Sequence, residues 1–236
     1  AAASGKKLWS FKTGSHLESS PHIADGRVFF GAGDDGVYCL DSADGRKLWH
    51  QGGLHVDISP LLSGGLVYAG SGYGKLEAFA LDGRSGAFAW RTPVKLPAWG
   101  APVRLGNRII YGLGNGNFTE SAQKPAGAVL SLSAVTGKLA WRTELPDGVL
   151  TAVVAGRKAL FVGCRDGRVY SLDPASGELL WSAACGAGAV VSSPLLDSAE
   201  RALVVASTGG LLHGLAPASG RRLWSLELRK LLGEEE

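Results

Sequence analysis

The stretch from Asp173 to Trp181 reads DPASGELLW, and close variants of it recur throughout the 236-residue chain. Each variant ends in a tryptophan that stands shortly after a glycine. Six tryptophans occupy this position: Trp9, Trp49, Trp90, Trp141, Trp181 and Trp224. Successive tryptophans are 40, 41, 51, 40 and 43 residues apart. Such a period indicates a repeat architecture, in which each repeat is one supersecondary unit.

The repeat from Ser19 to Gln51 shows the internal pattern of one unit. Its sequence, SSPHIADGRVFFGAGDDGVYCLDSADGRKLWHQ, contains four short apolar runs separated by turns that contain glycine. This alternation predicts four antiparallel strands. Paired helices are excluded because a glycine or proline arrives every few residues. Four-stranded units of about 40–45 residues are typical of β-propeller blades. We therefore expect an all-β propeller fold.

The recurring tryptophan has a structural interpretation. It begins the fourth, outermost strand of a unit, where a large ring can fill the wedge between one blade and the next. Burying such a ring removes roughly 150–250 Å² from water. The preceding glycine can adopt the positive φ that a tight turn requires. We interpret the six tryptophans as docking residues that hold neighbouring blades together.

The repeats divide the chain into three parts. We expect residues 1–18 to be an outer strand of a preceding blade and residues 229–236 to be a tail. Between them, residues 19–228 should form five blades, approximately 19–54, 55–96, 97–146, 147–186 and 187–228. Because the chain opens inside a repeat, we expect it to be a piece of a larger propeller of seven or eight blades.

The segment Lys6–Gly14 resembles a fourth strand that lacks its first three. In a ring closed at five blades it would pair with Leu211–Leu215, but Arg221–Leu228 already fills that place. One of the two strands would then be left unpaired. We do not expect this, because an unpaired edge strand promotes aggregation. We therefore expect Lys6–Gly14 to stand before the first blade, with Trp9 packed against it.

Composition excludes several classes of function. The chain is 45% hydrophobic and 19% charged, which favours a large buried core. The formal net charge is only +3, and the basic residues form no stripe of the kind that binds nucleic acid. No apolar run approaches the roughly 18 residues that span a bilayer. We expect no nucleic-acid partner and no direct membrane insertion.

The stretch LDPASGELLW and its variants resemble the tryptophan docking motif of pyrroloquinoline-quinone-type propeller repeats. The resemblance extends from Gly5 to Trp224 and implies a β-propeller. That superfamily includes quinoprotein alcohol dehydrogenases, the non-enzymatic lipoprotein of the outer-membrane barrel-assembly machinery, and secreted or sensor-attached propellers. The resemblance therefore fixes the fold more sharply than the function.

The quinoprotein enzymes bind their cofactor through a calcium ion held by Glu, Asn and Asp, beside a disulfide between adjacent cysteines. The GLGN stretch at Gly112–Asn115 is similar to the step that donates the calcium-ligating Asn, which would place Asn115 in that role. No matching Glu or Asp motif accompanies it, and no two cysteines are adjacent. We expect no catalytic residues and no cofactor; the alternative is pyrroloquinoline quinone with calcium.

The unit with the 51-residue spacing carries an insertion that must leave its sheet as a loop. Its candidate binding residues are Asn115, Asn117, Phe118, Thr119 and Glu120. A polar loop with one aromatic suits recognition of a peptide, a glycan or an ion. The alternative is that the loop has no binding role and is merely accommodated by the fold.

The cysteines and histidines point to no metal centre by spacing alone. The three cysteines fit small apolar residues packed in blades, while a Cys164–Cys185 bridge stays open. His16, His22 and His55 lie near first strands of the first two repeats, which run beside the central channel of a propeller. Without nearby cysteines or paired carboxylates at fixed spacing, we expect no metal site.

Two function hypotheses follow. The first is a non-catalytic scaffold of the barrel-assembly lipoprotein type, periplasmic or extracellular in a bacterial envelope, which binds proteins or peptides on a propeller face. The second is a fragment of a quinone- and calcium-dependent alcohol dehydrogenase. The sensor region of a larger signalling protein would be a variant of the first. The missing cysteine pair and carboxylates favour the first hypothesis.

Overall fold

The computed structural model describes residues 3–117, 119–228 and 230, which form twenty strands. The strands make five antiparallel sheets of four strands each, and the order within every sheet follows the chain. Two compact units divide the chain, Ala1–Ala98 and Trp99–Glu236. The all-β fold of four-stranded blades predicted from the repeats is confirmed.

The first unit contains two sheets, in which adjacent strands are joined as hairpins. The first sheet comprises β1 (His22–Ala24), β2 (Arg27–Gly31), β3 (Val37–Asp41) and β4 (Lys47–Gln51). The second sheet comprises β5 (Leu61–Ser63), β6 (Leu66–Gly70), β7 (Glu77–Asp82) and β8 (Phe88–Pro93). The first strands of the two sheets, β1 and β5, lie close together.

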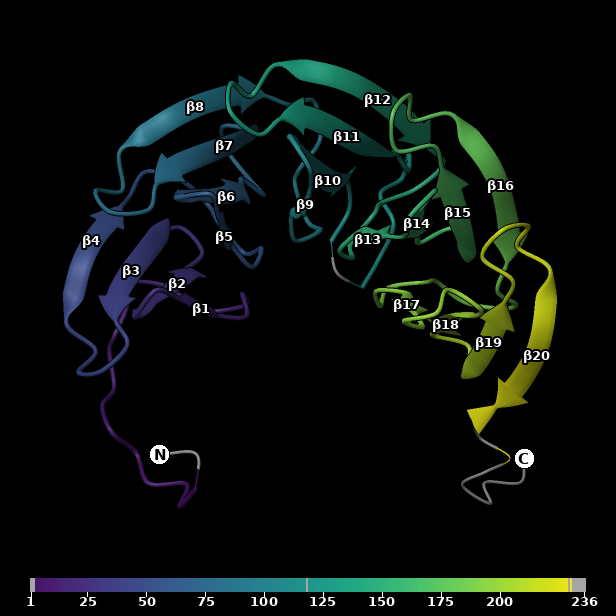
Figure 1. The fold of residues 1–236 in the computed structure, drawn as a ribbon, viewed down its shortest axis with the longest axis horizontal. Helices are drawn as coiled ribbons and strands as arrows, with labels where there is room; N and C mark the ends of the chain where they lie inside the picture. Colours follow the sequence, from purple (N-terminus) through teal and green to yellow (C-terminus); the bar gives the residue numbers. More distant parts are fainter. Residues whose placement is uncertain (1–2, 118, 229, 231–236) are drawn as a thin grey trace. The chain divides into compact units, whose positions relative to one another are not determined.

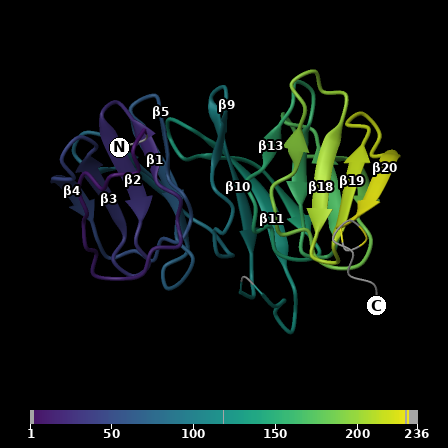
Figure 2. The same cartoon turned by 90° about the horizontal axis from the view of Figure 1, so that it is seen from below.

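The second unit contains three sheets built in the same way. They comprise β9 (Val103–Leu105), β10 (Arg108–Gly114), β11 (Gly127–Ser133) and β12 (Leu139–Leu145); β13 (Val154–Ala155), β14 (Leu160–Gly163), β15 (Arg168–Leu172) and β16 (Leu179–Ala184); and β17 (Leu195–Leu196), β18 (Leu203–Ser207), β19 (Leu211–Leu215) and β20 (Arg222–Glu227). Within this unit β12, β16 and β20 lie on the outer side of their sheets (Figure 1). Figure 2 shows β18, β19 and β20 side by side.

Every sheet has the same irregularity between its third and fourth strands. The register shifts by one residue, for example between Cys39 and Leu40 in β3. In each case the docking tryptophan pairs with the residue immediately before the shift, as Trp49 pairs with Cys39. An extra residue bends a strand and increases its local twist. The docking tryptophan therefore stands at the same position relative to this shift in all five sheets.

The core lies between neighbouring sheets. In the second unit one cluster joins Val129 of β11 and Trp141 of β12 to Val162 of β14. The next cluster joins Phe161 of β14 to Val205 of β18. The middle strands β10, β11, β14 and β15 are therefore buried on both faces, and stability comes from sheet-on-sheet packing of apolar side chains.

The segment Lys6–Gly14 belongs to none of the five sheets, because no described strand offers it a ladder partner. Trp9 and Phe11 nevertheless pack against the core of the first sheet. In the second unit β19 is already paired on both edges, with β18 and with β20. The place that a closing outer strand would take on β19 is thus occupied.

The cysteines form no disulfide: Cys39, Cys164 and Cys185 are all free and buried. The open alternative of a Cys164–Cys185 bridge is therefore wrong. Among the described residues, none belongs to a helix with the length and apolar character needed to cross a bilayer. Apart from residue 230, the predicted tail at 229–236 lies outside the described residues.

Candidate functional site

The docking tryptophans use their indole nitrogens as well as their rings. Nε1 of Trp49 donates to the carbonyl oxygen of Gly83 at 3.1 Å, in the β7–β8 turn of the next sheet. In the second unit, Nε1 of Trp141 donates in the same way to Pro174, at 3.2 Å. The corresponding bonds of Trp9 and Trp181 reach Ser42 at 3.1 Å and Pro217 at 2.9 Å. Trp49, Trp141 and Trp181 therefore link neighbouring sheets within each unit, and Trp9 links the segment before β1 to the first sheet.

The glycine of the accepting turn lies against the indole. A Cβ on Gly86, whose φ is +75°, would lie 2.8 Å from the ring of Trp49. Gly177 has a φ of +76°, and a Cβ there would lie 2.5 Å from the ring of Trp141. The turn glycine thus serves two needs at once, a left-handed backbone conformation and space for the ring.

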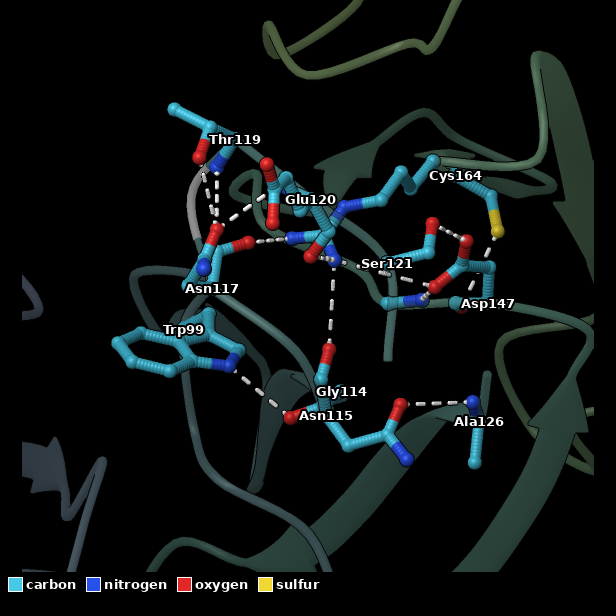
Figure 3. A network of polar contacts seen from close by, with 12 residues as sticks. Trp99, Gly114, Asn115, Asn117, Thr119, Glu120, Ser121, Ala126, Asp147 and Cys164 are labelled. Carbon is cyan, nitrogen blue, oxygen red and sulfur yellow. Dashed lines mark hydrogen bonds and ion pairs between the residues drawn. The ribbon is translucent and has the colours of Figure 1, made fainter. Parts of the chain in front are cut away.

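The candidate binding loop leaves β10 at Asn115, whose side chain closes the base of the loop. Its Oδ1 accepts from the backbone N–H of Ala126 at 2.8 Å, and its Nδ2 donates to the carbonyl of Lys124 at 2.8 Å. Its own backbone N–H donates to the carbonyl of Ala126 at 3.0 Å. Asn115 therefore joins the two ends of the loop (Figure 3).

Asn117 shapes the tip of the loop. Its Oδ1 accepts from the backbone N–H groups of Thr119 and Glu120, each at 2.8 Å, and from the Thr119 hydroxyl at 2.9 Å. This is the local turn that Asn side chains characteristically stabilise. All three of these residues are exposed. Phe118, the aromatic member of the predicted set, lies outside the described residues.

A buried arginine from the next sheet holds the loop from beneath. Arg165, in the β14–β15 turn, has a side chain only 4% exposed. Its guanidinium donates to the carbonyls of Glu120 at 2.6 Å, of Asn115 at 3.4 Å and of Asn117. Five N–H donors in a rigid fork suit this convergence of carbonyl oxygens. The loop is consequently fixed by a residue far away in sequence.

Asp147 completes the network. It lies 4.0 Å from the Arg165 guanidinium, accepts from the Ser121 hydroxyl, and accepts from the Gly148 N–H at 2.6 Å. The Cys164 thiol donates to the Asp147 carbonyl at 3.1 Å. Burial raises the pKa of that thiol to about 12, so Cys164 stays protonated. Sequence reasoning missed Arg165 and Asp147, because the RDG stretch at 165–167 indicates only a turn.

Trp99 lies beneath the same loop in this unit. Its indole is 3% exposed, and its Nε1 donates to the carbonyl of Gly114 at 2.9 Å, at the end of β10 (Figure 3). The indole thus supports the strand from which the candidate loop departs.

The first unit contains a second polar cluster. His16 Nε2 lies 3.3 Å from Asp57 Oδ1, and His55 Nε2 lies 2.6 Å from Asp57 Oδ2. His55 Nδ1 lies 2.6 Å from Asp34 Oδ1. Burial lowers the pKa of His55, but the hydrogen bonds and charges of Asp34 and Asp57 outweigh it and raise the pKa above its usual value. A cavity of about 230 Å³ borders Asp34, His55 and Tyr73.

Of the three histidines expected near first strands, the structure brings His16 and His55 together with one carboxylate. His22 lies in β1 and is not part of this group. The sequence did not indicate that these three residues meet, because the HVD stretch at 55–57 is separated from His16 by nearly 40 residues.

Four-stranded sheets that dock through tryptophans onto the turns of the next sheet define a β-propeller repeat protein, here with a loop held rigidly on one blade. The chain belongs to the family described as outer membrane protein assembly factor BamB, which matches residues 1–123 and 98–235.

Individual relatives include both assembly factors and alcohol dehydrogenases. The outer membrane protein assembly factor BamB of Legionella pneumophila is 27% identical over 187 residues, covering 74% of this chain and 45% of that protein. The quinohemoprotein alcohol dehydrogenase ADH-IIG of Pseudomonas putida is 29% identical over 154 residues, covering 57% of this chain and 20% of that protein. The chain thus spans less than half the length of either relative.

The solved structures agree on the fold. The crystal structure of BamB from Moraxella catarrhalis superposes with a TM-score of 0.74 at 18% identity, over 93% of this chain and 64% of that one. At this identity the likeness supports the propeller fold alone.

Proposed function

We propose that this chain is a non-catalytic β-propeller scaffold of the bacterial envelope, which binds a protein partner in outer membrane protein assembly. Membership of the BamB family supports the setting. The observation that carries the binding role is the loop between β10 and β11, whose backbone carbonyls are held by the buried Arg165 while Thr119 and Glu120 face solvent.

A loop held in this way suits protein binding for a thermodynamic reason. Ordering a free loop at an interface costs about 0.5–1.5 kcal/mol for each immobilised side chain. Arg165 and Asn115 order the backbone of this loop before any partner arrives. The partner then contacts exposed polar side chains at a reduced entropic cost.

Cross-linking in the native envelope tests the proposal. A photoreactive amino acid replaces Glu120 in the complete protein, and the products are identified by mass spectrometry. Arg201 is the matched control position, because its side chain is 83% exposed on the β17–β18 turn of the same unit. We expect a component of outer membrane protein assembly to cross-link at Glu120 and not at Arg201. The same products at both positions, or none at Glu120, would contradict the proposal.

The relation to quinohemoprotein alcohol dehydrogenases supports a second candidate, quinone-dependent oxidation of an alcohol. The residue of this chain that favours this candidate is Asn115, because its GLGN context is similar to the calcium-ligating step of those enzymes. We propose that Asn115 serves the loop instead, because both polar atoms of its side chain are used in closing it. Titration of the purified protein with pyrroloquinoline quinone and Ca²⁺, followed by absorbance, should give no stoichiometric complex. Calcium-dependent binding that Asn115→Ala abolishes would favour the oxidoreductase.

A further inference from the structure

We propose that His16, His55 and Asp57 form a zinc-binding site in the first unit, with a fourth coordination position left open. The site goes beyond the proposed scaffold function, because it lies in a different unit from the candidate binding loop. Its residues come from two separate stretches of chain, the segment before β1 and the segment between β4 and β5.

The backbone places two of the ligands side by side. Gly33 and Val56 form an isolated antiparallel bridge, with N–H to carbonyl distances of 3.2 and 2.9 Å. Alternate side chains of an extended stretch point to opposite sides. Val56 enters the core and is fully buried, so His55 and Asp57 share the opposite side.

The third ligand, His16, lies close to the other two because Gly33 has no side chain. Gly33 has a φ of +49°, and a Cβ on it would lie 2.6 Å from Cε1 of His16. His16 can therefore pack directly over the Gly33 backbone, which brings its Nε2 to 3.3 Å from Asp57 Oδ1. The two imidazole rings have centroids 5.9 Å apart.

The spacing of the three ligand atoms suits a small divalent ion. All three atoms lie within 4.8 Å of one another. Zinc bonds of about 2.0–2.1 Å at tetrahedral angles require ligand atoms about 3.3 Å apart. The separation of His16 Nε2 and Asp57 Oδ1 has this value.

Outer hydrogen bonds orient both imidazoles. His55 Nδ1 lies 2.6 Å from a carboxylate oxygen of Asp34, and His16 Nδ1 lies 3.2 Å from the Ser15 hydroxyl. In both histidines, Nε2 is the nitrogen directed toward Asp57. Metal-binding histidines almost always bond their second ring nitrogen in this way, and a carboxylate partner increases ligand basicity.

The burial of Asp57 is a second argument for a cation at this position. Its side chain is only 3% exposed, and its Oδ1 accepts no hydrogen bond from any described residue. A buried carboxylate oxygen without a hydrogen bond is costly. A metal ion bound between Oδ1 and the two Nε2 atoms would satisfy that oxygen.

The donor set selects the class of metal. Two imidazole nitrogens and one carboxylate oxygen suit zinc, whereas calcium and magnesium prefer oxygen ligands throughout. Three protein ligands leave one position for water or an outside ligand. A bound ion would also tie the segment that carries Ser15 and His16 to the segment between β4 and β5.

Calorimetric titration of the untagged chain with zinc chloride tests the site, with Co²⁺ absorption reporting coordination number. We expect one high-affinity site and a four-coordinate Co²⁺ spectrum. Asp34→Asn should weaken zinc binding about 10–100-fold, as expected for an outer partner. His16→Gln and Asp57→Asn should weaken it further, because each removes a direct ligand.

His22→Gln is the matched control, since His22 lies on β1 outside the cluster, and it should bind zinc like the parent chain. Circular dichroism of the metal-free variants checks their folding. If Asp57→Asn fails to fold, His16→Gln decides, because the His16 side chain is 48% exposed. Absence of one-site binding, or unchanged binding in His16→Gln, would overturn the proposal.

Discussion

The indole of Trp49 donates a hydrogen bond of 3.1 Å to the carbonyl of Gly83, so an outer strand of one sheet is joined to the last turn of the next. The same relationship joins Trp141 to Pro174 and Trp181 to Pro217, and Trp9, which lies in no sheet, donates in the same way to Ser42. A repeat protein of this kind gains stability from interfaces between neighbours as well as from the repeats themselves. The docking turn is therefore the first place to test.

Gly86→Ala should destabilise the protein by about 2–4 kcal/mol, because it combines a left-handed backbone with overpacking against the Trp49 ring. Gly65→Ala is the matched control. Gly65 has a φ of +79°, but a Cβ there meets nothing within 4 Å, so only about 1 kcal/mol should be lost. Urea unfolding of the two variants measures the difference, and equal losses would show that the ring contact contributes nothing.

Trp49→Ala should cost about 3–5 kcal/mol of unfolding free energy, because a large buried ring leaves a cavity between two sheets. Trp224→Ala should cost markedly less, since Trp224 is 42% exposed whereas Trp49 is 8% exposed. Chemical denaturation of this chain distinguishes the two. A cost for Trp224→Ala as large as that for Trp49→Ala would be inconsistent with docking through burial.

Arg165→Met should loosen the loop between β10 and β11, because three backbone carbonyls lose their donor. Hydrogen exchange at residues 119–126 should accelerate, and stability should fall by about 3 kcal/mol as Asp147 loses its buried partner. Arg157→Met is the control, since that side chain is 75% exposed. Unchanged exchange in the loop would mean that Arg165 does not order it.

Tyr38→Phe should change the dependence of stability on pH. The Tyr38 hydroxyl donates to Asp35 at 2.5 Å and, together with the N–H of Gly14, holds the pKa of Asp35 below its usual value. A depressed carboxyl pKa stabilises the folded state above the unfolded pKa of about 3.9, and that contribution disappears as pH falls through the folded value.

The variant should therefore lose less stability than the parent between pH 5 and pH 2. Unfolding experiments across this range, with NMR titration of the Asp35 carboxyl carbon, provide the measurement. An Asp35 pKa that stays equally low in the variant would assign the shift to the Gly14 N–H and the charges of His50 and Lys47 instead.

The three cysteines should react slowly with maleimides in the folded protein at pH 8. Burial raises the pKa of Cys39 and of Cys185 to about 11, so almost no thiolate is present to attack. Burial raises the pKa of the Cys164 thiol as well. Mass spectrometry should find labelling only after urea is added. Rapid labelling without denaturant would show that a thiol is exposed.

The sequence alone determined the repeat unit, its four strands and the pairing of a turn glycine with a following tryptophan. These features depend on local chemistry, namely apolar runs of strand length, glycines at turns and one large ring per period. The same logic located the loop after Asn115, because an insertion into a regular repeat must leave the sheet. The same pattern identifies Trp9 as a docking residue, although it does not show which turn accepts the hydrogen bond of the Trp9 indole.

Only the tertiary structure decided which distant residues meet. Arg165 reaches the carbonyl of Asn117, 48 residues earlier, because the sheets of the second unit stack with their turns adjacent. His16 reaches Asp57 because Gly33 provides no side chain between them. Contacts of this kind depend on how whole sheets pack, whereas a local sequence pattern encodes only the strand and turn in which each residue stands.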